Sequence, residues 1–115
     1  MSEPGAVQTD LPITTGTELA GAQIVENLGL CFGLIVRSMG LAKGVTASFS
    51  ALRKGEVSQY TEVLEDSRRH AVDRMIANAH LLGADAIVAV RFDSSEIGSG
   101  MTEILAYGTA VKLVR

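Results

Sequence analysis

The hydrophobic pattern from Ser58 to Leu82 is that of one long amphipathic helix. At 100° per residue six of its apolar side chains fall within about a quarter-turn of one direction, and several charged ones point roughly opposite. This apolar stripe consists of Tyr60, Leu64, Ala71, Met75, Ala79 and Leu82. Ser58 can cap the start of the helix, and Gly83 can follow its last turn. We therefore expect one long helix with a single buried side.

The stretch from Ala22 to Ser38 alternates as an extended chain does. One side carries Ile24, Leu28, Leu30, Phe32, Leu34 and Val36; the other carries Gln23, Val25, Asn27, Cys31, Ile35 and Arg37. Glycine inside a strand marks a bend, a bulge or a close approach of two backbones. Gly29 and Gly33 interrupt the pattern, which predicts one bent strand or two consecutive ones.

Two further strands are expected over 84–94 and 101–114, joined as a hairpin by the turn residues 95–100. If the turn is centred near Ile97, Arg91 lies opposite Glu103 as a cross-strand ion pair. The even-numbered face, with Ala86, Val88, Val90, Ile104, Ala106 and Gly108, then suits packing against the long helix. The odd-numbered face carries Ile87, Ala89, Arg91, Leu105 and Tyr107.

That odd-numbered face is too apolar to meet water freely, and the long helix can cover only one side of the sheet. A partner subunit is the economical cover, because most soluble oligomers are symmetric copies of one chain. We also expect shorter elements, namely a strand at 13–15, a turn at 16–21 and a short helix within 40–55. We expect a disordered tail at 1–11 and a single domain at 12–115.

Composition excludes several classes of function. The net charge is −3, aromatic residues make up 4% of the chain and tryptophan is absent. Nucleic-acid binding needs a basic stripe or stacking aromatics, so we expect no nucleic-acid partner. No apolar run approaches the roughly twenty residues of a membrane span, and the N-terminus lacks a signal-peptide pattern. One cysteine fits a soluble cytoplasmic protein.

The segment Leu82-Gly83-Ala84-Asp85-Ala86-Ile87-Val88-Ala89-Val90-Arg91-Phe92-Asp93, followed by Met101-Thr102-Glu103-Ile104 and Ala106-Tyr107-Gly108-Thr109-Ala110-Val111, resembles the YbjQ-like family. This family comprises small bacterial and archaeal proteins of unknown function, grouped as putative heavy-metal-binding. The resemblance covers about 13–115. It implies an α/β (α+β) two-layer sandwich, dodecin-like, with a mainly antiparallel sheet and one long helix. It also implies assembly into a homopentameric ring.

Few residues offer chemistry. Cys31 is the candidate ligand for a soft metal ion. One thiol alone cannot chelate, although in a ring the thiols of several copies could converge on the axis, and a packing role is favoured. His70 and His80 lie about 15 Å apart along the helix and cannot share a metal. Arg68 falls inside the apolar stripe, where it either lies along the core or reaches a neighbouring subunit. The expected oligomer interface comprises Arg68, Arg91, Glu103 and Tyr107.

Three functions remain open on the sequence. The first is a non-enzymatic homo-oligomer whose ring binds a small ligand or a metal ion. The second is a structural or regulatory assembly protein without a small-molecule site. The third is an enzyme with an active site between subunits, built on Arg91, Glu103 and Tyr107.

Overall fold

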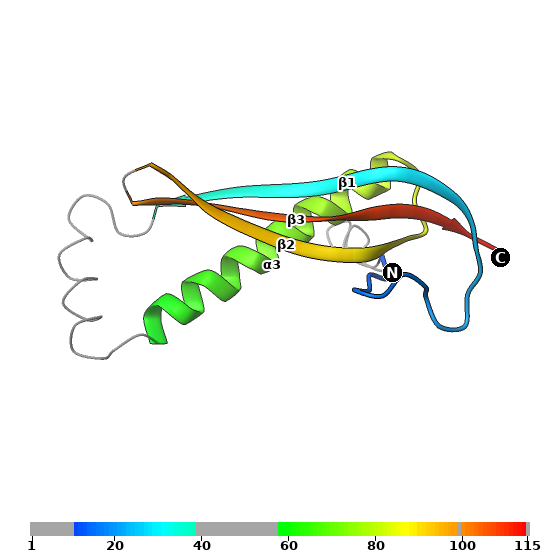
Figure 1. The fold of residues 1–115 in the computed structure, drawn as a ribbon, viewed down its shortest axis with the longest axis horizontal. Helices are drawn as coiled ribbons and strands as arrows, with labels where there is room; N and C mark the ends of the chain where they lie inside the picture. Colours follow the sequence, from blue (N-terminus) through cyan, green and yellow to red (C-terminus); the bar gives the residue numbers. More distant parts are fainter. Residues whose placement is uncertain (1–10, 39–57, 99, 115) are drawn as a thin grey trace, which may run out of the picture.

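The computed structural model describes residues 11–38, 58–98 and 100–114. It has two layers, a three-stranded sheet and one helix (Figure 1). The elements are β1 (Ile24–Ser38), α3 (Ser58–Leu81), β2 (Ala86–Gly98) and β3 (Met101–Leu113). This confirms the expected α+β architecture with an antiparallel sheet. The short helix expected within 40–55, and the tail apart from Leu11, lie outside the described residues.

The sheet has the order β1-β3-β2, and β3 pairs antiparallel with both neighbours. Helix α3 crosses one face of the sheet at an angle (Figure 1). It packs chiefly on β1, less on β3, and hardly touches β2. Asn78 of α3 donates a hydrogen bond to the Phe32 carbonyl at 2.7 Å and ties the helix to β1.

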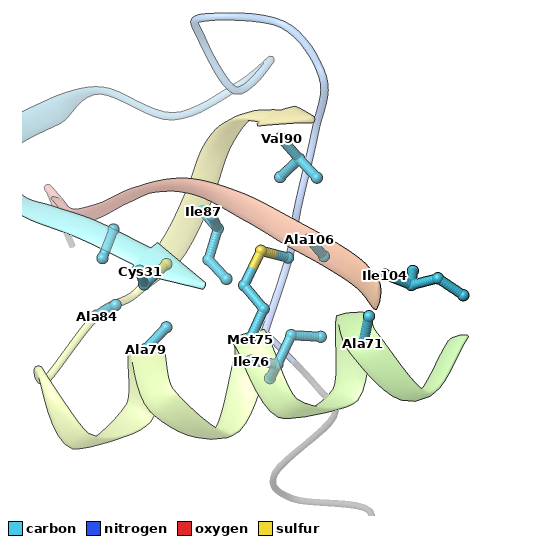
Figure 2. Close-up of a cluster of buried hydrophobic side chains, with 11 residues drawn as sticks. Cys31, Ala71, Met75, Ile76, Ala79, Ala84, Ile87, Val90, Ile104 and Ala106 are labelled. Carbon is cyan, nitrogen blue, oxygen red and sulfur yellow. The ribbon is translucent and has the colours of Figure 1, made fainter. Parts of the chain in front are cut away.

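The main core lies between α3 and the sheet (Figure 2). Its buried members are Cys31, Ala71, Met75, Ile76, Ala79, Ala84, Ile87, Val90, Ile104, Ala106 and Ala110. Met75 is fully buried and points from the helix toward the sheet. Gly33 lies where β1 runs against the backbone of α3, so that an added Cβ would collide with the Ala71 carbonyl and the Met75 amide.

The C-terminal end of α3 follows from its sequence. Gly83 has φ 79°, a left-handed conformation that glycine adopts without steric cost. Its amide donates to the His80 carbonyl at 3.0 Å, and the Ala84 amide donates to the Ala79 carbonyl at 3.1 Å. These two bonds form a Schellman motif, which satisfies carbonyls at the helix end. The predicted helix over 58–82 is thereby confirmed to within one residue.

The predicted faces of β2 need correction. One extra residue separates Val88, opposite Thr109, from Arg91, opposite Tyr107. Ala89 has φ 55° within this bulge, which reverses the alternation of the strand. Ile87 therefore belongs to the core beneath α3, although we expected it on the uncovered face. Ala86 and Val88, expected beneath the helix, instead pack with Val111, Leu19, Ile24 and Leu113 in a second cluster.

The predicted hairpin register is wrong. Arg91 lies opposite Tyr107, and Glu103 lies opposite Ser95, so Arg91 and Glu103 are not partners. The reason is that β2 continues to Gly98, which pairs with Met101. The polar residues from Ser94 to Glu96 have the composition of a turn, yet they form an exposed strand.

The N-terminal described segment lies along the first part of β2. Ile13 forms an isolated parallel bridge with Ile87, in place of the strand expected over 13–15. The Thr14 amide donates to the Ile87 carbonyl, and the Val90 amide donates to the Thr14 carbonyl, both at 3.0 Å. The outer edge of β2 is thus paired near the bulge. No described residue pairs with it beyond Arg91.

Candidate functional site

The face of the sheet turned away from α3 carries three rows of side chains, which we call the outer face. The register gives the rows Phe32–Tyr107–Arg91, Leu34–Leu105–Asp93 and Val36–Glu103–Ser95. Leu30 of β1 precedes the first row. Alternation explains the grouping, because the intervening residues Cys31, Gly33 and Ile35 are turned toward the helix.

The outer face is both apolar and open to solvent. Leu30, Phe32, Leu34 and Val36 keep 65%, 48%, 39% and 52% of their surface exposed. A shallow hollow of about 500 Å³ is lined by Leu30, Phe32, Leu34, Leu105 and Tyr107, with Asp93 and Glu103. Soluble monomers seldom expose large contiguous apolar patches, so this surface is a candidate interaction site. The expected position of Tyr107 on an uncovered face is what the structure shows.

Arg91 and Glu103 lie on the outer face but have different partners. Arg91 Nη1 donates to the carbonyls of Thr15 and Val90, each at 2.9 Å. The Ser95 hydroxyl donates to Glu103 Oε1 at 3.5 Å, the long limit for such a bond. Arg91 therefore secures the N-terminal segment to β2, a role that the incorrect register concealed.

Arg68 lies on the other side of β2, beside the helix. Its guanidinium carbon is 5.0 Å from the centre of the Phe92 ring, a cation–π contact. Arg68, Arg69, Val72, Asp73 and Phe92 line a groove of about 300 Å³ between α3 and β2. Neither Phe92 nor Asp93 was singled out from the sequence. Both lie on the faces that the predicted alternation gives them, Phe92 toward the helix and Asp93 on the outer face.

A polar cluster joins the end of β1 to α3. Arg37 Nη2 donates to His70 Nδ1 at 3.2 Å and lies 3.9 Å from Asp66 Oδ2, while His70 Nε2 lies 3.8 Å from the same oxygen. The first bond requires the imidazole tautomer that carries its proton on Nε2. His80 is exposed and takes no part in this cluster.

Cys31 is a core residue in this structure. It is 3% exposed, lies opposite Gly108 on β3 and packs in the cluster between α3 and the sheet (Figure 2). Burial raises the pKa of its thiol, because desolvation penalises the thiolate. The thiolate is the form that binds metals, so this environment opposes coordination. That Cys31 is not a physiological metal ligand stays a prediction.

The raised pKa of Cys31 predicts a loss of stability in mild alkali. Above about pH 8.5 the thiol of the unfolded chain gives up its proton, while the folded chain still holds it. Since the unfolded state then binds fewer protons, the free energy of unfolding falls, by at most about 1.4 kcal/mol per pH unit. Urea unfolding between pH 7.5 and 10 should show this slope in the wild type and a shallower one in Cys31→Ala. Equal slopes would contradict it.

The described residues do not form a heavy-metal site within one chain. They contain no group of three or more histidine, cysteine, aspartate and glutamate side chains placed to share an ion. His70 and Asp66 could offer two metal ligands, but the Arg37 guanidinium contacts both side chains. Its positive charge opposes a bound cation. No helix among the described residues is long and apolar enough to cross a membrane.

The sequence of this chain is similar to those of known proteins. Residues 11–114 match the YbjQ family model, described as "Putative heavy-metal-binding". A UPF0145 protein of Bradyrhizobium sp. is 46% identical over 104 residues, 90% of this chain and 94% of that protein. Another, from Thermosipho africanus, is 50% identical over 101 residues, 88% and 94% of the two chains.

A solved structure shares the fold. It is a Pediococcus pentosaceus protein of unknown function from the DUF74 family, with a TM-score of 0.61 and 18% identity. The match covers 90% of this chain and 98% of that one. At 18% identity this similarity shows a shared arrangement of the sheet and helix, and nothing about function.

Proposed function

This chain belongs to the YbjQ family of proteins described as "Putative heavy-metal-binding", and on that premise we propose that it acts without catalysis, as a homo-oligomer. The observation that carries the proposal is the outer face. Four large apolar side chains of β1 lie exposed there, beside Leu105 and Tyr107. Covering them would remove apolar surface from water, which stabilises an assembly by about 25 cal/mol for each Å² buried. A homopentameric ring is the form that the family resemblance implies.

Two features support a binding rather than a catalytic role. Arg91 and Glu103, on which an active site between subunits would depend, engage different groups of their own chain. The hollow on the outer face is lined mainly by aliphatic and aromatic side chains. In our proposal the assembled protein binds a small ligand or a soft metal ion. Because Cys31 is in the core, a metal would take its ligands from other residues of several copies.

The test is native mass spectrometry of the protein taken directly from cells, which reports subunit number and retained ligand mass together. The wild type should give one assembled species. Leu34→Glu places a charge in the middle of the outer face and should shift the population to monomer. The matched control is Leu81→Glu, because Leu81 is 85% exposed at the end of α3. A folded wild-type monomer at micromolar concentration would refute the proposal.

A further inference from the structure

We propose that the outer face of one copy receives the Arg68–Phe92 side of the next copy, with Asp93 and Glu103 as the acceptors of Arg68. This inference rests on the proposed self-assembly and names its second surface. The contact joins two different surfaces of the chain, so each copy offers one surface to each of two neighbours. Such a head-to-tail contact closes into a ring or continues as a filament.

The first surface has a distinct chemistry. Asp93 and Glu103 border the apolar hollow of the outer face. They are diagonal neighbours across β2 and β3, since Asp93 lies opposite Leu105 and Ser95 lies opposite Glu103. Arg91, on the same face, is hydrogen-bonded to the Thr15 carbonyl. The hollow is therefore apolar in its centre and has two carboxylates that no described cation pairs with.

The second surface complements the first in charge and in shape. Arg68 lies over the Phe92 ring and makes no ion pair with any described residue. A guanidinium on an aromatic face keeps N–H donors at its own edge, and these suit carboxylate oxygens. Arg69, which lines the same groove, forms an ion pair with Glu65, with 3.9 Å between Nη2 and Oε1. Arg68 is therefore the arginine of this groove that can pair with carboxylates of another copy. Phe92 is 40% exposed and offers the ring that would enter an apolar hollow.

The alternative is a two-fold contact in which two outer faces pack on each other. That arrangement would bring Asp93 and Glu103 of both copies into one interface, where like charges in close contact oppose association. Arg91, which lies on the same face, is held by carbonyl groups of its own chain. The separate location of Arg68, on the opposite side of β2, therefore favours the head-to-tail contact.

The experiment is a charge exchange followed by native mass spectrometry at fixed micromolar concentration. Glu103→Arg alone and Arg68→Glu alone should each weaken association by about a hundredfold, because each places like charges together. The double variant carries both changes in every copy, re-forms an opposite pair at each contact and should recover assembly. Far-ultraviolet circular dichroism verifies that each variant is folded.

Matched controls make the same charge changes elsewhere. Arg74→Glu alters an exposed arginine of α3 that lies outside the groove, and Glu96→Arg alters a glutamate of β2 that lies outside the hollow. Both variants should keep the wild-type number of subunits in the assembly. Loss of assembly in Glu103→Arg without loss in Arg68→Glu would overturn the head-to-tail contact and leave self-assembly standing. A monomeric wild type would instead refute the proposed function itself.

Discussion

Gly33→Ala should destabilise the protein by about 3 kcal/mol, because overpacking a tight contact forces the backbone to move. The added methyl would meet the Ala71 carbonyl and the Met75 amide, and Arg74 C at 2.9 Å. These atoms belong to the backbone of α3 and cannot rotate away as a side chain can. The lower chain entropy of alanine in the unfolded state offsets at most about 1 kcal/mol of this cost.

The measurement is urea unfolding at one protein concentration, since an oligomer's stability depends on concentration. Gly98→Ala is the matched control, because its Cβ would meet only Met101 Cε, at an ordinary 3.6 Å. That variant should unfold at the wild-type midpoint or slightly above it. Equal midpoints for Gly33→Ala and Gly98→Ala would show that α3 does not lie as close to β1 as described.

Met75→Ala should cost about 2–5 kcal/mol of folding free energy. Met75 is fully buried and fills the centre of the core between α3 and the sheet (Figure 2). Alanine would leave a cavity lined by neighbours that are mostly small and can relax only in part. The cost therefore includes the lost transfer energy of the thioether chain and the cavity that it leaves.

Leu81→Ala is the control for this substitution. Leu81 belongs to the same helix but is 85% exposed, so its truncation should change the free energy of unfolding by less than about 0.5 kcal/mol. Both variants should keep the wild-type dependence of unfolding on urea concentration, since neither changes the surface exposed on unfolding by much. If Met75→Ala and Leu81→Ala proved equally mild, the core would not be organised around Met75.

The sequence by itself determined the elements whose signals are local. The helical spacing from Ser58, with Gly83 after the last turn, located α3 because amphipathic periodicity and end residues act over only a few positions. Alternation in β1 placed Leu30, Phe32, Leu34 and Val36 on one side. The apolar odd-numbered face of the hairpin indicated that one side of the sheet would lack cover from the helix.

Only the tertiary structure decided the parts that depend on pairing between strands. The bulge at Ala89 moves Ile87 into the core, while Arg91, beyond the bulge, stays on the outer face that alternation predicted. No local residue preference announces the bulge. The longer β2 places Glu103 opposite Ser95 rather than Arg91. A single inserted residue reverses every later side chain of a strand. The faces of Ala86, Ile87 and Val88 were therefore fixed by packing and pairing, and not by the alternation in sequence.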